Sequence, residues 1–137
     1  MRLTQAQATA RLSDHDHGVL CTVHPVRGVD AVPVVYAVRD DLIGIPVDLV
    51  KPKSTTRLQR ERNLAADPRA CLLVEHWDRR DWTRLWWVRA ELRATPAAPT
   101  EPLADALAGR YPQYRDHPFA RVLVLTMVSV HGWSAIT

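Results

Sequence analysis

Short runs of Val, Leu and Ile, separated by turn residues, dominate the first third of the chain. Residues 18–24, 30–38 and 42–47 are rich in apolar and β-branched side chains, and the segments "PVRG" and "RDD" lie between them. This pattern predicts three short strands arranged as an antiparallel meander. Residues 4–14 precede them and predict a short helix, with Thr4 as its N-cap.

A loop and a helix follow the third predicted strand. Pro52 ends that strand, and Ser54 is a favourable N-cap for a helix. Residues 55–66 favour helix until "DP" at positions 67–68 stops it. The helix is therefore expected to be inserted between the third strand and the next one.

Alternation of apolar and polar residues marks the segment 82–94. A strand there places Trp86 on an apolar face and Trp87 on the opposite, charged face, and this period fits better than a helical one. Trp86 is expected to join the core. Trp87 must then meet a partner subunit, a ligand or the inserted helix.

The remaining pattern completes a mainly β domain. It predicts a strand at 69–77, a loop at 95–102, a helix at 103–114 that ends near Gly109, and a strand at 121–135 with a break at Gly132. Six or so antiparallel strands with a few short helices favour a small closed sheet. The whole chain, residues 1–137, is expected to form one domain.

The composition is that of a globular protein, with 47% hydrophobic and 24% charged residues. The apolar runs are shorter than the ~18 residues that a membrane span requires, and the first residues lack the apolar core of a signal peptide. Cys21 and Cys71 each lie inside an apolar segment, which predicts buried, reduced thiols. The sequence thus predicts a cytoplasmic protein without membrane association.

The positive charge is concentrated in one stretch of the chain. Residues 51–62 carry five basic side chains and one acidic side chain, a local sum of +4. The other 13 basic and 14 acidic residues sum to −1. This distribution favours a local anion site over a surface that binds nucleic acid, which would spread Lys and Arg along a face.

Side-chain catalysis is not indicated. The chain has no GxSxG, HExxH, P-loop or GxGxxG motif. His15 and His17 in "DHDH" follow a predicted helix, where solvated polar residues are common, and the chain offers no Cys–His cluster, so no metal site is expected. A bound cofactor would need only a shaped, charged cleft.

The stretch "VKPKSTTR" can supply such a cleft. Here the chain leaves a strand and enters a predicted helix, so free N–H groups and hydroxyls can converge on a phosphate beside Lys51 and Lys53. Arg57, Arg60 and Arg62 are spaced so that they need not share a face. Some of them are therefore expected to be solvated helix charges.

The order of several segments resembles a known family. "PVDLVKPKSTTRLQRERNLAADPRACLLVEHWDRRDWTRLWWVRAELRA" (46–94) and "GWSA" (132–135) are similar to the pyridoxamine-5'-phosphate-oxidase-like proteins that use the deazaflavin coenzyme F420. The resemblance spans about residues 15–136. It implies an FMN-binding-type split β-barrel, a homodimer with clefts between subunits, and hydride transfer between the deazaflavin and a small organic acceptor.

The resemblance also implies roles for individual residues. Tyr36 is a candidate proton donor, although a core position is more usual for a Tyr on a Val-rich strand, and no catalytic residue is assigned. Arg57, Arg60 and Arg89 could serve the anionic tail of coenzyme F420, and Trp77 and Trp87 could close the cleft, from the same or the other subunit. The implied cofactor-binding residues are, for the phosphate, Lys51, Lys53, Ser54, Thr55 and Arg57, and for the ring, Val32, Pro33, Pro46 and Val47.

Two other functions stay open at this point. One is an FMN-binding oxidase or reductase of the same fold, and the other is a non-catalytic protein that stores coenzyme F420. The chain lacks the C-terminal extension of true pyridoxamine-phosphate oxidases, which argues against vitamin B6 oxidation. It also lacks the long N-terminal segment of some nitroreductase-like relatives, so a membrane-associated role is less expected.

Overall fold

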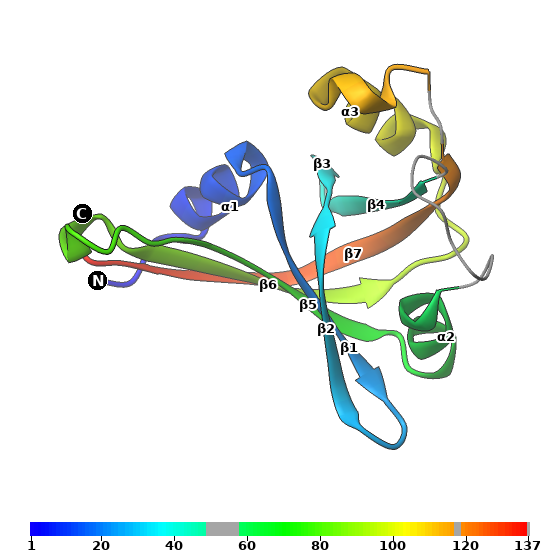
Figure 1. Cartoon of the computed structure of the whole chain (residues 1–137), viewed down its shortest axis with the longest axis horizontal. Helices are drawn as coiled ribbons and strands as arrows, with labels where there is room; N and C mark the ends of the chain where they lie inside the picture. The colour runs from blue at the N-terminus through cyan, green and yellow to red at the C-terminus, as the bar shows by residue number, and fades with distance from the viewer. Residues whose placement is uncertain (49–57, 117–118, 137) are drawn as a thin grey trace.

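In the part of the chain that the structure describes, seven antiparallel strands form one sheet in the order β2-β1-β5-β6-β7-β4-β3 (Figure 1). The computed structural model describes residues 1–48, 58–116 and 119–136. The strands are β1 (His17–His24), β2 (Gly28–Val35), β3 (Ala37–Arg39), β4 (Leu42–Asp48), β5 (Arg69–His76), β6 (Trp86–Ala94) and β7 (Phe119–Ser134). The helices are α1 (Gln5–Asp14), α2 (Gln59–Ala66) and α3 (Glu101–Arg110), with short 3-10 turns η1 (Trp82–Arg84) and η2 (Pro112–Tyr114).

The sheet curls into a split barrel. β2 and β3 lie at its opposite edges, yet only Tyr36 separates them in the chain, so the two edges must come together. The mainly β split barrel expected from the sequence is thus confirmed. Across the described ranges, no helix combines the length and apolarity needed to cross a bilayer.

The predicted meander is wrong, because residues 30–38 are not one strand. β2 pairs with β1 up to Val35, and Ala37 then begins a hairpin with β4. Tyr36, which lies at the change of partner, is fully buried, and its hydroxyl donates a 2.5 Å hydrogen bond to the carbonyl of Leu12. The apolar pattern runs through this point without interruption, so it could not signal that the chain moves to the other sheet edge.

The N-terminal helix follows its sequence signals. Thr4 Oγ1 accepts from the Gln7 backbone N–H at 3.1 Å, and the Thr4 N–H donates to Gln7 Oε1 at 2.9 Å, which completes a capping box. Ala8 and Leu12 on the inner side of α1 are buried in the core. The prediction of this helix is confirmed.

The alternation along β6 is also confirmed. Val88, Ala90 and Leu92 are buried, whereas Arg89, Glu91 and Arg93 are exposed. The strand begins at Trp86 and not at residue 82, because Asp81 caps a 3-10 turn through its bonds to Thr83. Trp86 packs against the core, and Trp87 faces the other side of the sheet.

β7 continues through Gly132, where a break was expected. A Cβ at this position would lie 2.8 Å from Leu3 Cδ1 and 3.1 Å from the Trp87 carbonyl oxygen. The Leu3 N–H donates to the Gly132 carbonyl at 2.9 Å. The glycine therefore makes room for the N-terminal segment against an uninterrupted strand.

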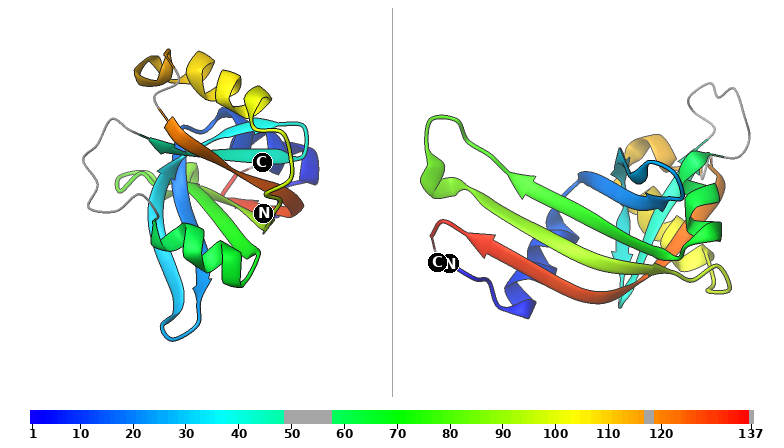
Figure 2. Two further views of the ribbon diagram at one scale, coloured as in Figure 1. Left: turned by 90° about the vertical axis from the view of Figure 1, so that its right-hand side faces the viewer. Right: turned by 90° about the horizontal axis from the view of Figure 1, so that it is seen from below.

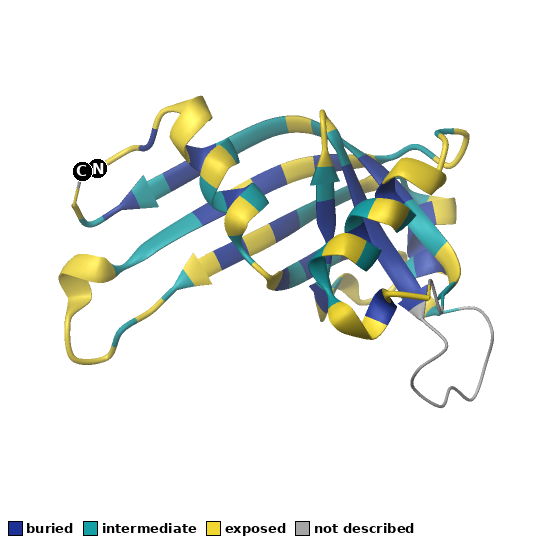
Figure 3. Ribbon diagram, turned by 90° about the horizontal axis from the view of Figure 1, so that it is seen from above, coloured by how far each residue is buried: buried dark blue, intermediate teal, exposed yellow. Residues whose placement is uncertain are grey.

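The long strands extend beyond the curled part of the sheet. β5, β6 and β7 run out to the end where the two termini lie, and α2 lies at the opposite end (Figures 1 and 2). Buried and exposed residues alternate along much of β5 and β6 (Figure 3). α3 covers the other edge of the barrel, where Leu103 and Leu107 are fully buried; it begins at Glu101, two residues before its predicted start, and ends at Arg110.

Candidate functional site

A cavity of about 680 Å³ lies between α2, the first half of β7 and the loop that follows β6. This volume is in the range of small-molecule and cofactor sites. Most of the described wall is apolar, and one acidic and one basic residue interrupt it. The lining residues are Glu61, Leu64, Ala65, Pro68, Ala94, Pro96, Thr100, Ala120, Arg121, Val122, Leu123 and Val124.

The acid and the base of this wall form an ion pair. Arg121 Nε and Nη2 each donate a 2.8 Å hydrogen bond to the Glu61 carboxylate, whose residue is only 8% exposed. These hydrogen bonds raise the pKa of the Arg121 guanidinium above its usual value. Glu61 also accepts from the Leu58 N–H at 3.1 Å. Because the two charges cancel, the described wall supplies apolar surface with no net positive charge.

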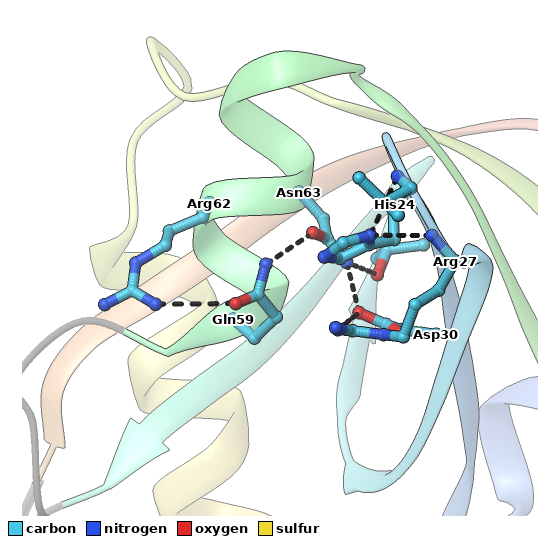
Figure 4. A network of polar contacts seen from close by, with 8 residues as sticks. His24, Arg27, Asp30, Gln59, Arg62 and Asn63 are labelled. Carbon is cyan, nitrogen blue, oxygen red and sulfur yellow. Dashed lines mark hydrogen bonds and ion pairs between the residues drawn. The ribbon is translucent and has the colours of Figure 1, made fainter.

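α2 is fixed to the β1–β2 hairpin by a polar network around Asn63 (Figure 4). Asn63, 1% exposed, donates through Nδ2 to Thr22 Oγ1 and to Asp30 Oδ2, both at 2.9 Å. Its Oδ1 accepts from Gln59 Nε2 at 2.9 Å. All polar atoms of the buried amide are thus engaged, which holds the cavity wall formed by α2 in place.

Asp30 accepts the hydrogen bond from the Asn63 amide as an ionised carboxylate. Arg27 binds Asp30 through two hydrogen bonds of 2.9 and 2.8 Å. The Arg27 hydrogen bonds, followed by the bond from Asn63, lower the pKa of Asp30 to about 2. Asp30 is therefore ionised at neutral pH and can accept from both neighbours. At the tip of the hairpin, His24 Nδ1 accepts from the N–H groups of Val26 and Arg27.

Segment 49–57 contains Lys51, Lys53 and Arg57, and the residues that flank it on both sides lie beside this cavity. At one side of the segment, Asp48 pairs with Phe119 at the start of β7. At the other, Leu58 adjoins α2 and donates its N–H to Glu61. The predicted phosphate ligands Lys51, Lys53, Ser54, Thr55 and Arg57 lie between these points, outside the described residues.

The predicted start of this helix is wrong. α2 begins at Gln59, and its N-cap Leu58 is extended, with φ −81° and ψ 155°. The described helix therefore starts four residues later than expected, with Leu58 as its N-cap, and the predicted N-cap Ser54 lies outside the described residues. The Glu61 carboxylate bonds the backbone of Leu58 instead, three residues before it, which lets an apolar residue stand at the cap.

The predicted ring-binding residues take different positions. Pro46 and Val47 of β4 are buried and pair with the cavity-lining Val122 and Arg121. Val32 is half-buried against the core, and Pro33 is exposed on β2; neither is among the described residues that line the cavity. Arg60 lies half-buried on α2, next in sequence to Glu61.

The two tryptophans expected to close the cleft lie far from it in the same chain. Trp77 directly follows β5, whose first residue, Arg69, lies next to the cavity-lining Pro68. The eight residues of β5 separate them by roughly 25 Å at the usual strand rise. Trp87 is the second residue of β6, whose last residue, Ala94, lines the cavity, so Trp87 lies near the distant end of that strand.

Several side chains singled out by the sequence have structural roles. Tyr36 is in the core, and burial raises the pKa of its hydroxyl, so it is not placed to donate a proton. Cys21 and Cys71 are free, as expected, but they are half-buried and stand opposite each other on β1 and β5. Burial, followed by the neighbouring Cys21 thiol, raises the pKa of Cys71. In the described part of the chain, no three His, Cys, Asp or Glu side chains gather as metal ligands.

Sequence reasoning missed Glu61, Asn63 and Arg121. Two signals were present. Glu61 is the lone acid in the basic stretch 51–62, and its ion pair with Arg121, outside this stretch, explains it. Asn63 stands inside a helix, where asparagine is unfavourable unless its amide has a tertiary partner. The identity of those partners depends on the fold and could not be read from spacing.

No family model and no curated protein matches the chain. Its fold matches solved structures. A FAD-binding protein from Mesorhizobium loti is similar over 96% of this chain and 93% of its own, with a TM-score of 0.69 and 17% identity. A pyridoxamine 5'-phosphate oxidase candidate from Corynebacterium glutamicum is similar over 98% of both chains, with a TM-score of 0.58 and 14% identity.

A haem-binding protein from Mycobacterium smegmatis has a TM-score of 0.66 and 16% identity, and the chain covers 57% of its length. The ligands of these structures therefore differ, although their fold is the same. At these identities the likeness shows the fold alone. The chain has the split β-barrel fold that flavin-binding proteins and pyridoxamine-phosphate-oxidase-like proteins share.

Proposed function

We propose that the protein is an oxidoreductase that binds coenzyme F420 and transfers a hydride between its deazaflavin ring and a small organic acceptor. The observation that carries the proposal is the 680 Å³ cavity, whose apolar, charge-neutral wall adjoins both ends of the basic segment 49–57. An apolar wall suits a planar ring. Lys51, Lys53 and Arg57 would meet the phosphodiester at its edge.

Charge favours coenzyme F420 over FMN within this fold. The deazaflavin cofactor carries a phosphodiester and a tail of glutamates, so it is longer and more anionic than FMN. The local sum of +4 over residues 51–62 matches this demand, and Arg60 and Arg62 lie on the helix that forms one wall. Arg89 is a further tail ligand only if the tail reaches β6. FMN or FAD is the alternative, supported by the FAD-binding protein of the same fold.

The residues of this chain would bind, orient and shield the cofactor. The ring supplies the two-electron chemistry when it is bound. Val122, Leu123 and Leu64 would exclude water from one side of it. The Glu61–Arg121 pair joins α2 to β7, and the Asn63 network joins α2 to the β1–β2 hairpin. These contacts would hold the cavity in its shape.

The proposal includes a homodimer. Trp77 and Trp87 cannot close the cavity of their own chain, because they lie at the other end of β5 and β6. In a dimer whose long strands reach over the partner, they would close the partner's cleft instead. Trp77 and Trp82 are 52% and 65% exposed, as expected for aromatic side chains that a second subunit would cover.

Ligand titration tests the cofactor assignment. Purified protein would be titrated with coenzyme F420, FMN, FAD and haemin, following tryptophan fluorescence. We expect coenzyme F420 to bind most tightly. Tight binding of FMN, FAD or haemin without a response to coenzyme F420 would show that the cofactor assignment is wrong.

The Lys53→Ala variant tests the phosphate site. We expect about a tenfold loss of coenzyme F420 affinity, because a charge-assisted hydrogen bond is removed. Arg39→Ala is the matched control, since Arg39 is exposed on β3, away from the cavity lining. Equal affinities in the two variants, with unchanged circular dichroism, would argue against Lys53 as a ligand.

Turnover separates the enzyme from a storage protein. Reduced coenzyme F420 would be incubated with the protein and with quinones, nitro compounds and tetrapyrroles as acceptors, and the return of the oxidised absorbance would be recorded. Oxidation above the uncatalysed rate supports the reductase. Tight binding without turnover across this panel would favour storage.

A further inference from the structure

A second cavity, of about 340 Å³, lies at the opposite end of the molecule from the candidate cofactor site. It opens between α1 and the ends of β5, β6 and β7. Its lining residues are Arg11, His76, Thr83, Arg84, Trp86, Ser134 and Ile136. The volume is at the lower end of the range for small-molecule sites.

Trp86 lines this pocket, and cationic and aromatic groups surround its ring. The Arg11 guanidinium lies over its ring, 5.1 Å from the centroid. The His76 ring is nearly parallel to it, at 19° and 6.4 Å between centroids, and His15 meets it edge-on at 5.3 Å. The indole is thus a half-buried aromatic platform with a cation already placed against it.

The charge of the lining is positive. Arg11 and Arg84 are among its lining residues, and none of the described lining residues carries a carboxylate. Arg84 has only a long ion pair with Asp78, at 3.7 Å, and its side chain is 62% exposed. Among the described residues, no carboxylate forms an ion pair with Arg11. Both arginines can therefore take an external anion without breaking a buried interaction.

Polar and apolar groups surround these cations. Thr83, Ser134 and Ile136 complete the lining, and the Thr83 hydroxyl donates to the Asp81 carboxylate at 2.5 Å. A ligand that satisfies this lining needs a flat apolar body for Trp86 and an anionic group for Arg11. A carboxylate fits a guanidinium through two parallel hydrogen bonds.

We propose that this pocket binds a small planar aromatic carboxylate, with the ring against Trp86 and the carboxylate on Arg11 and Arg84. Within one chain the site is separate from the cofactor cavity, and the proposal does not rest on the proposed function. Benzoate is the simplest probe of this class.

The experiment follows the indole N–H resonances of the ¹⁵N-labelled full chain during titration with benzoate. Trp86→Phe, which keeps an aromatic ring at this position, identifies the Trp86 resonance by its loss. We expect saturable movement of that resonance, with weaker binding of benzyl alcohol, which lacks the charge, and of acetate, which lacks the ring. No movement, or equal binding of benzyl alcohol, would overturn the proposal.

Charge variants then assign the ligand residue. Arg11→Gln should weaken benzoate binding about tenfold, because it removes the charge and keeps a polar side chain of similar reach. Arg39→Gln is the matched control on a distant strand and should leave the affinity unchanged. Lys53→Ala should also leave it unchanged, which separates this site from the cofactor cavity. If Lys53→Ala weakens benzoate binding and Arg11→Gln does not, the anion lies in the other cavity and the proposal fails.

Discussion

Single side chains decide how the candidate site is held. Asn63 is the clearest case, because one buried amide joins α2 to two strands through Thr22 and Asp30. The sequence showed an asparagine in a helix, but not that its partners stand 41 and 33 residues away. Long-range polar pairs of this kind depend on the curl of the sheet, so they follow from the fold and not from local pattern.

Asn63→Ala should destabilise the protein by about 1–3 kcal/mol, because Thr22 and Gln59 lose their partner in a buried position. Asn63→Asp should cost more, since it places a carboxylate against the Asp30 carboxylate. Urea unfolding at neutral pH measures both. Gln113→Ala, an exposed amide on η2, is the control and should change the free energy of unfolding by less than about 0.5 kcal/mol.

Asp30 should make the stability of the protein sensitive to acid. Its pKa is about 2 in the folded chain and 3.8 for an unperturbed Asp, as in the unfolded chain. The stabilisation is complete above the unfolded value and is lost as the pH falls from about 4 to about 2, because the unfolded chain takes up the proton first. Urea unfolding across this range should show a smaller loss for Asp30→Asn than for the unchanged protein. An identical pH dependence would contradict the role of this carboxylate.

At the scale of elements, the sequence predicted most helices and strands but not where the chain changes partner. α1, β5 and the two faces of β6 followed from caps and alternation. The division of residues 30–38 at Tyr36 did not, because both halves are apolar and extended. The break predicted at Gly132 is wrong for a related reason. A glycine within a strand pattern locally indicates a break, but this glycine is needed because a larger residue would clash with Leu3, which is far away in sequence.

Gly132→Ala should therefore be costly, by about 1–3 kcal/mol, since the added methyl group would meet Leu3 at 2.8 Å and the Trp87 backbone at 3.1 Å. Gly109→Ala is the matched control. A methyl group there meets nothing within 4 Å, and alanine is the better helix former, so α3 should gain about 0.5–1 kcal/mol. Thermal and urea unfolding of the two variants should move in opposite directions. Equal shifts would show that Gly132 does not act through this contact.

At the scale of the whole molecule, the sequence indicated a closed β domain but not the distance between its two ends. The basic segment adjoins the cavity at one end, and the exposed tryptophans lie at the other. Between them, Pro33, Val19 and Leu73 stand side by side on β2, β1 and β5, on the outer face of the sheet. Leu73 is 37% exposed there. A second copy of the chain packed on this face would cover its apolar surface and bring the tryptophans of that copy toward the cavity.

Leu73→Arg should convert the proposed homodimer into a monomer, because it would bury a charge in the proposed interface. Sedimentation equilibrium measures the mass, and circular dichroism checks that the fold is kept. Arg79→Ala, in the exposed turn after β5, is the surface control and should remain dimeric. A monomeric unchanged protein would rule out the shared cleft outright.

Mixed dimers test whether the cleft is shared between subunits. Lys53→Ala and Trp87→Ala should each bind coenzyme F420 poorly. If Lys53 and the partner's Trp87 form one site, co-refolding the two variants places both substitutions in one cleft of each mixed dimer and leaves the other cleft intact. Random pairing should then restore about a quarter of the sites. If both residues served the cleft of their own chain, every site would keep one defect, and mixing would restore none.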